Sequence, residues 1–158
     1  MPTTEVIEEH FIAIQGFFER GVAQRGTRSL RDGISIAIYL DGKGPVTLTK
    51  RGGSVLILKE LPEKPDMSFW IPGPAVKALE SVTTEDVGEL GVEILKLMAH
   101  SDETYRVTAK VHIGPFDLLR NGYLSVLPLG GPTVMKFLAS KGFTGIGKIK
   151  DAISRMRA

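Results

Sequence analysis

The chain has 158 residues, a formal net charge of +2 and no cysteine. This length suits a single domain over residues 1–158 that buries roughly two thirds of its unfolded surface without a disulfide or a metal. The lack of cysteine excludes disulfides, thiolate catalysis, sulfur-ligated zinc and iron–sulfur clusters. The weak net charge gives no general attraction to nucleic acid, although it leaves room for a local basic patch.

The N-terminal residues predict an amphipathic first helix. Ile7, Phe11, Ile14 and Phe18 recur at helical spacing, and glutamates occupy the first turn. Because no basic run leads into an apolar stretch, we expect no secretory signal and a cytoplasmic location by default. The polar connector that follows, residues 25–32, is expected to be a solvated loop.

Four strands are predicted next, separated by turn sequences. They cover Ile34–Leu40, Val46–Lys50, Ser54–Lys59 and Asp66–Ile71. The third is a continuous apolar run, which predicts an internal strand buried on both faces. In the fourth, Met67, Phe69 and Ile71 alternate with Ser68 and Trp70.

Two helices are expected after the fourth strand. The first is short and begins near Pro74, and the second is longer and begins at Thr83, which has capping-box spacing to Asp86. Gly88 and Gly91 lie within the longer helix, where each glycine costs about 1 kcal/mol relative to alanine. Their presence indicates a close neighbour, which could be another helix or a bound ligand.

A fifth strand with one solvated face is predicted for Tyr105–Ile113, and Pro115 then suits the first turn of a helix. The apolar stretch Leu124–Phe143 is interrupted by proline and glycine, so it cannot span a bilayer and predicts two short helices hinged at residues 128–132. A last helix with basic flanks is expected near residues 146–156.

Catalytic signatures are absent from the sequence. His10, His100 and His112 occur in three different elements, where each is expected to be a surface or helix-end residue. Residues 142–148 fit the spacing of a phosphate-binding loop, but Ile149 stands where a magnesium-binding Ser or Thr is required. We therefore expect no enzymatic activity, metal or cofactor.

The order of these elements resembles the sterol carrier protein type two family, from Gly33 onward. The similarity is carried by four stretches: Ile36–Gly42, Gly53–Leu58, Asp66–Ile71 and Val111–Gly114. The resemblance implies an α+β fold with a mostly antiparallel five-stranded sheet, covered on one face by helices. It further implies an apolar tunnel between the two layers that encloses a fatty acyl chain, sterol or isoprenoid-like lipid.

The expected wall of this tunnel consists of apolar side chains chosen by face and neighbourhood. They are Trp70, Leu90, Ile94, Met98, Phe116, Leu119, Leu127, Val134, Met135 and Leu138. Each of them could equally be an ordinary core residue. A pocket of this kind needs no convergent polar groups, which agrees with their scarcity here.

Two other uses of the apolar C-terminal helices remain open. They could form a homodimer interface, as exposed apolar patches often do. The basic C-terminal helix could also contact a membrane surface transiently. No nucleic-acid partner is expected.

Overall fold

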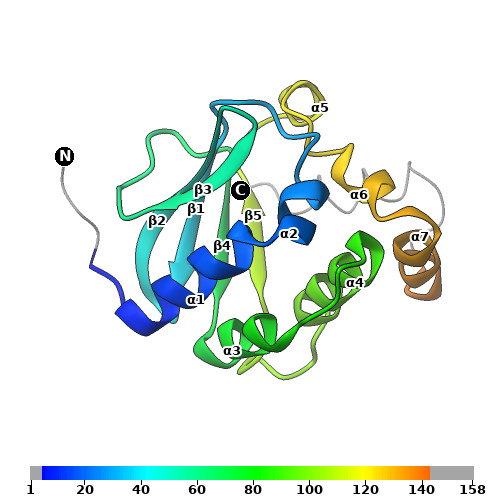
Figure 1. Ribbon diagram of the computed structural model, residues 1–158, viewed down its shortest axis with the longest axis horizontal. Helices are drawn as coiled ribbons and strands as arrows, with labels where there is room; N and C mark the ends of the chain where they lie inside the picture. The colour runs from blue at the N-terminus through cyan, green and yellow to red at the C-terminus, as the bar shows by residue number, and fades with distance from the viewer. Residues whose placement is uncertain (1–4, 143–158) are drawn as a thin grey trace.

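The α+β fold is confirmed by a computed structural model, which describes residues 5–142 apart from the side chains of Leu127 and Pro128. Five strands form one open sheet in the order β3-β2-β1-β4-β5 (Figure 1). The strands are β1 (Ser35–Leu40), β2 (Lys43–Arg51), β3 (Ser54–Leu58), β4 (Met67–Ile71) and β5 (Thr108–Val111). All five predicted strands are present.

Seven helices occur in the described part of the chain. They are α1 (Glu8–Glu19), α2 (Gly21–Gly26), α3 (Gly73–Ser81), α4 (Val87–Met98), α5 (Pro115–Arg120), α6 (Val126–Leu129) and α7 (Gly131–Ser140). Figure 1 shows α1 and α2 lying across one face of the sheet, and α7 on the far side of α4.

The central strand β1 organises the sheet. It runs antiparallel to β2 and parallel to β4, whereas the outer pairs β2–β3 and β4–β5 are antiparallel. Ile36, Ile38 and Leu40 point into the main core, together with Met67 and Ile71 of β4. The period-two pattern seen in the sequence therefore separates a helix-covered face from an outer face.

The first helix has the predicted apolar face. Phe11, Ile14 and Phe17 of α1 are buried against the sheet. The helix ends at Arg20, whose guanidinium donates to the carbonyl oxygens of Val82 and Thr84. This contact ties the junction of α1 and α2 to the loop before α4.

The prediction that the third strand is internal was wrong. β3 is an edge strand, and its side chains alternate between buried and exposed. Val55 and Ile57 face the core, whereas Leu56 is 36% exposed on the outer face. In the sequence, an apolar residue on the exposed face of a strand looks the same as a buried one. Composition alone therefore could not show that β3 lies at the edge of the sheet.

The N-cap residue of α4 lies three residues later than predicted. Asp86 is the N-cap residue, and its carboxylate accepts the backbone N–H of Glu89 at 3.1 Å. Thr84 donates its hydroxyl to the carboxylate of Glu89 and accepts the N–H of Asp86. Asp86 therefore caps the helix, Thr84 bridges the Glu89 carboxylate to the N–H of Asp86 in place of the direct bond of a capping box, and Thr83 takes no part.

The last strand, β5, is shorter than predicted, although the alternation of buried and exposed residues was predicted correctly. Val107 and Val111 are buried, whereas Thr108 and Lys110 are exposed. α6 and α7 are separated at Gly130, which confirms two short helices with a break between them. The expected helix near residues 146–156 and most of the loop 142–148 lie outside the described residues.

The polar connector between α2 and β1 is anchored and not simply solvated, as had been expected. Lys50 of β2 is only 5% exposed, and its ammonium faces this connector. It donates to the carbonyl oxygens of Leu30 at 2.7 Å, Arg28 at 2.9 Å and Thr27 at 3.3 Å. A buried charge is tolerated there because these three acceptors replace its water.

His10 lies in the first turn of α1, which fits the expectation of a helix-end residue, but it is buried. Its Nε2 atom lies 3.9 Å from the carboxylate of Asp41, which accepts the backbone N–H of Gly73 at 2.9 Å. α1, the end of β1 and the start of α3 meet at this point.

Candidate functional site

Helix α4 is apolar on two opposite sides. Leu90 and Leu97 are buried in the main core. On the other side, Val92 and Leu95 pack against Val134 and Leu138 of α7 and form a second, separate cluster. We call these four side chains the α4–α7 layer. α7 is thus an outer element that α4 separates from the main core.

The glycines of α4 allow α7 to lie directly on the helix backbone. A Cβ atom at Gly88 would lie 2.5 Å from the carbonyl oxygen of Gly130, and one at Gly91 would lie 3.0 Å from Cγ2 of Val134. The close neighbour indicated by the glycines is therefore the junction between α6 and α7 at Gly88, and α7 itself at Gly91. Any larger residue at position 88 would force this junction outward.

The predicted wall residues with described side chains fall into separate regions. Leu90, Ile94 and Met98 belong to the main core or pack against it. Val134 and Leu138 belong to the α4–α7 layer. These two groups lie on opposite sides of α4, so α4 itself stands between them.

The remaining predicted wall residues are more exposed. Met135 on α7 is 37% exposed, and Phe116 and Leu119 on α5 are 71% and 58% exposed. Leu127 lies in α6, and its side chain is outside the described part. In this arrangement Phe116 and Leu119 point away from the protein interior, so they do not form the wall of an enclosed space.

Trp70 does not lie between the sheet and the helices. Its ring stacks on Tyr39 of the neighbouring strand, with centroids 5.1 Å apart and an interplanar angle of 5°. Phe69 and Ile71 on either side of it face the core, so Trp70 must face outward. The alternation in β4 already contained this information, and the choice of Trp70 as a tunnel residue was wrong for that reason.

A polar pair that the sequence did not reveal lies on the same outer face. The Oγ atom of Ser68 is 2.8 Å from Nε2 of His112, across the β4–β5 pair. Ser68 stands at an outward position of β4, and His112 directly follows β5 in phase with its outward residues Thr108 and Lys110, which was the available signal. His112 also lines an open hollow of about 410 Å³ with Lys64, Pro65 and Ile113.

This pair lacks the third group that nucleophilic catalysis requires. An activated serine needs a histidine that is itself oriented by another polar side chain. Within residues 5–142 no carboxylate hydrogen-bonds to the His112 ring, and no three His, Cys, Asp or Glu side chains are grouped to hold a metal. The pair joins β4 to the residue that follows β5 by one hydrogen bond.

Three comparisons with known proteins gave no match, whether against protein-family models, curated proteins or solved structures. Over the described residues, no helix has both the length and the apolar character needed to cross a bilayer.

Proposed function

We propose that the protein is a non-enzymatic cytoplasmic carrier of an apolar small molecule, such as a fatty acyl chain, a sterol or an isoprenoid-like lipid. The observation that supports this proposal is the α4–α7 layer, a small apolar cluster separate from the main core. A ligand would enter it when α7 moves away from α4.

Because the two clusters are separate, such an opening would leave the main core intact. Outward movement of α7 would uncover Val92 and Leu95, while Leu90 and Leu97 stay buried on the other side of α4. An acyl chain gains about 0.8 kcal/mol for each buried methylene, so about ten methylenes outweigh a typical association cost. The ligand would replace the contacts that α7 loses.

The resemblance to the sterol carrier protein type two family adds support from the sequence. Its motifs lie in β1, β3, β4 and at the end of β5, and the observed strand arrangement keeps them in one sheet.

An engineered cross-link tests the proposed opening directly. Cγ2 of Val134 lies 3.0 Å from a Cβ built at Gly91. A disulfide separates the Cβ of one cysteine from the sulfur of the other by about 3 Å, so Gly91→Cys with Val134→Cys should bond. The chain has no other cysteine to interfere.

The expected result is reversible loss of ligand uptake. The oxidised double variant should fail to bind a fluorescent fatty acid after delipidation, and reduction should restore binding. Each single cysteine variant is the matched control and should bind under both conditions. Equal binding by the oxidised and reduced double variant would show that α7 does not need to move. No uptake by the unmodified protein would contradict the carrier proposal itself.

The alternative is a homodimer interface formed by the C-terminal helices, and it is supported by the exposure of Met135 on α7. Sedimentation equilibrium distinguishes the two functions. A concentration-dependent mass that Met135→Glu abolishes, in a protein that carries no extractable lipid, would favour the dimer.

A further inference from the structure

One end of the molecule presents apolar side chains directly to solvent. On α5, Leu118 is buried in the core, whereas Phe116 is 71% and Leu119 58% exposed. Residues three apart on a helix are neighbours on its surface, so these two side chains lie together on the outward face of α5.

One arginine lies directly beside this apolar pair, and a loop that carries two more is hydrogen-bonded to the end of α5. The guanidinium of Arg120 lies 5.8 Å from the ring centroid of Phe116 and binds the carboxylate of Asp117 at 2.9 Å. The backbone N–H of Arg31 donates to the carbonyl oxygen of Asn121 at 2.9 Å. This bond places the loop of residues 28–31 beside the C-terminal end of α5.

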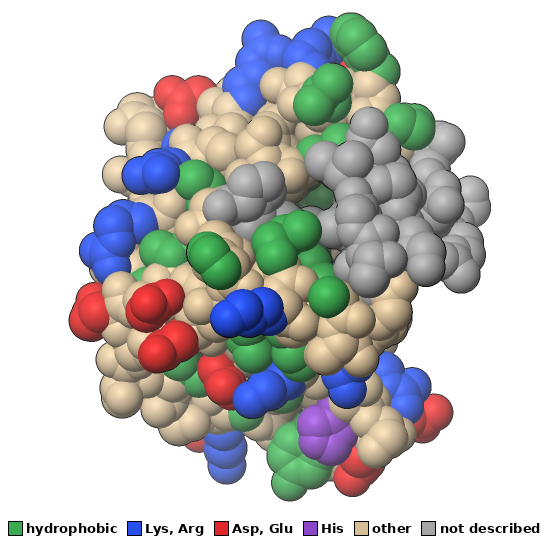
Figure 2. Space-filling model, turned by 90° about the vertical axis from the view of Figure 1, so that its right-hand side faces the viewer, with side chains coloured by type: hydrophobic (Ala, Val, Ile, Leu, Met, Phe, Trp, Pro, Cys, Tyr) green, Lys and Arg blue, Asp and Glu red, His purple; other side chains and the backbone are tan. Residues whose placement is uncertain are grey.

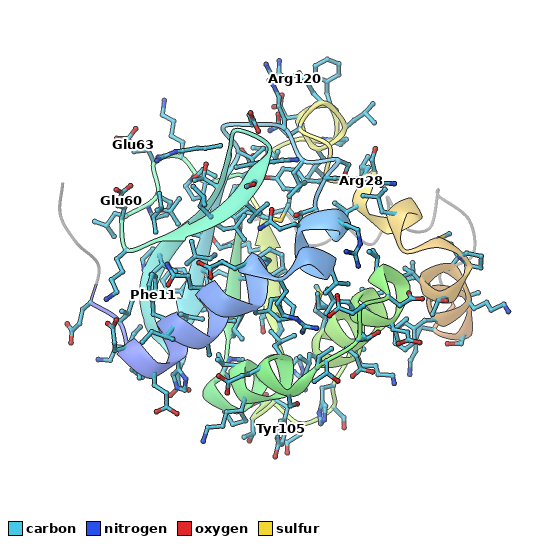
Figure 3. The ribbon with its side chains drawn as sticks, in the orientation of Figure 1. Phe11, Arg28, Glu60, Glu63, Tyr105 and Arg120 are labelled. Atoms are coloured by element: carbon cyan, nitrogen blue, oxygen red, sulfur yellow. The ribbon has the colours of Figure 1, made fainter. Side chains whose placement is uncertain are left out.

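A second hydrogen bond fixes the same juxtaposition. The hydroxyl of Ser29 donates to the carbonyl oxygen of Gly122 at 3.0 Å. Arg28 and Arg31, which flank Ser29, are both exposed. Figure 3 shows Arg28 and Arg120 in the upper part of the molecule, near α2, α6 and α5.

The formal charge at this end is net positive. Asp32 accepts the backbone N–H of Gly53 at 3.2 Å, which brings the β2–β3 turn and its exposed Arg51 alongside. Four arginines, Arg28, Arg31, Arg51 and Arg120, stand here against the three carboxylates of Asp32, Asp66 and Asp117. Figure 2 shows Lys and Arg side chains beside hydrophobic ones along its upper edge.

We propose that this end, formed by α5 and the loop of residues 28–31, docks on a membrane surface that contains anionic phospholipids. Interfacial binding combines apolar side chains that enter the headgroup region with cations that attract anionic lipid, and both are present here. Phe116 and Leu119 would insert, and Arg28, Arg31 and Arg120 would lie at the headgroups.

Charge favours a membrane over a second copy of the chain at this surface. A symmetric dimer through α5 would bring the arginines of two protomers together, which costs free energy. An anionic bilayer has the opposite charge. The proposal goes beyond ligand carriage, because docking here requires no bound ligand.

Vesicle co-sedimentation with the delipidated full chain tests the proposal. We expect binding to vesicles of phosphatidylcholine with phosphatidylserine and much weaker binding to phosphatidylcholine alone. Replacing Arg28 and Arg31 with glutamine should weaken binding by about fivefold for each residue. Phe116→Ser with Leu119→Ser should weaken it by at least about tenfold.

Ile12 offers a matched control, because it is an apolar helix residue on α1 with the same 58% exposure as Leu119. Ile12→Ser should bind vesicles as the unmodified protein does. A loss as large as that of the α5 variant would mean nonspecific adsorption and would overturn the proposal. Absence of binding to anionic vesicles would overturn it too.

Two further measurements locate the contact and exclude self-association. Phe116→Trp should be quenched by brominated lipid in anionic vesicles, whereas Trp70 of the unmodified protein should not. Sedimentation equilibrium could instead show a dimer that the double variant Phe116→Ser with Leu119→Ser dissociates. If vesicle binding is then also absent, this surface binds a second copy of the chain and the proposal is wrong. Failure of ligand uptake would leave all these outcomes unchanged.

Discussion

The Nζ atom of Lys50 lies 2.7 Å from the carbonyl oxygen of Leu30, inside the protein. Lysine is almost never fully buried without a partner. Here the partners are three main-chain oxygens of the α2–β1 connector, so one side chain of β2 holds the whole connector in place.

Replacement of this lysine should therefore destabilise the fold. Lys50→Met keeps most of the side-chain length but leaves the carbonyls of Leu30 and Arg28 without a donor, which should cost about 3 kcal/mol. Urea unfolding at pH 7 measures the loss. Lys110→Met, on the exposed face of β5, is the control and should change stability by less than about 0.5 kcal/mol. Equal effects would contradict the anchoring role.

Tyr123 should make stability depend on alkaline pH. Burial raises the pKa of its phenol, and the hydrogen bond that it donates to Asp66 at 2.7 Å raises the pKa further. Because the folded pKa exceeds the unfolded value of about 10, this contribution is complete below pH 10 and is lost as the pH rises above it. The loss should be about 1.4 kcal/mol for each pH unit.

Urea unfolding between pH 9 and 11, compared with Tyr123→Phe, isolates this effect. The variant should lose about 1 kcal/mol at pH 7 through the missing hydrogen bond. Above about pH 10 its stability should fall less steeply than that of the unmodified protein. Parallel pH curves for the two proteins would show that Tyr123 does not cause the dependence.

Two replacements of glycine by alanine should change the stability of the protein in opposite directions. In Gly88→Ala the new methyl group would lie 2.5 Å from the carbonyl oxygen of Gly130. Overpacking of this kind costs about 1–3 kcal/mol, which exceeds the gain in helix propensity of about 1 kcal/mol. In Gly16→Ala the methyl group meets nothing within 4 Å, so only the gain remains. Thermal unfolding should give a lower Tm for the first and a higher Tm for the second. Stabilisation by both would mean that α6 and α7 yield without cost.

The N-terminus of α4 allows a test of whether Asp86 or Thr83 caps the helix. Asp86→Ala should destabilise the protein by about 1 kcal/mol, because the backbone N–H of Glu89 loses its acceptor. Thr83→Ala should have almost no effect, since the N-cap residue is Asp86 and not Thr83. Chemical denaturation of the two variants compares them directly, and a larger loss for Thr83→Ala would restore the original assignment.

Local patterns predicted the elements well. The alternation of Met67, Phe69 and Ile71 depends on neighbours in the chain, and it gave the inward face of β4 correctly. Pro115 begins α5 as expected, because its fixed φ suits the first turn of a helix. The break between α6 and α7 also follows from local residues.

Relationships between distant segments were not predictable in the same way. The edge position of β3 depends on strand order, which the residues of β3 do not encode. The burial of His10 depends on Asp41 and Gly73, and that of Lys50 on the loop of residues 27–30. The candidate wall residues were chosen by face and neighbourhood in the sequence, and neither distinguishes the core side of α4 from the side that faces α7.

The parallel pairing of β1 with β4 also governs how the sheet can assemble. β1, β2 and β3 are consecutive neighbours joined by tight turns, whereas β4 reaches β1 only after the chain has passed through both other strands. Closing the longer loop costs more conformational entropy, so we expect the three-stranded meander to form first. Until β4 arrives, one edge of β1 is unpaired and able to bind another chain. The connector between β3 and β4, residues 59–66, thereby determines how long a nascent molecule is exposed to aggregation.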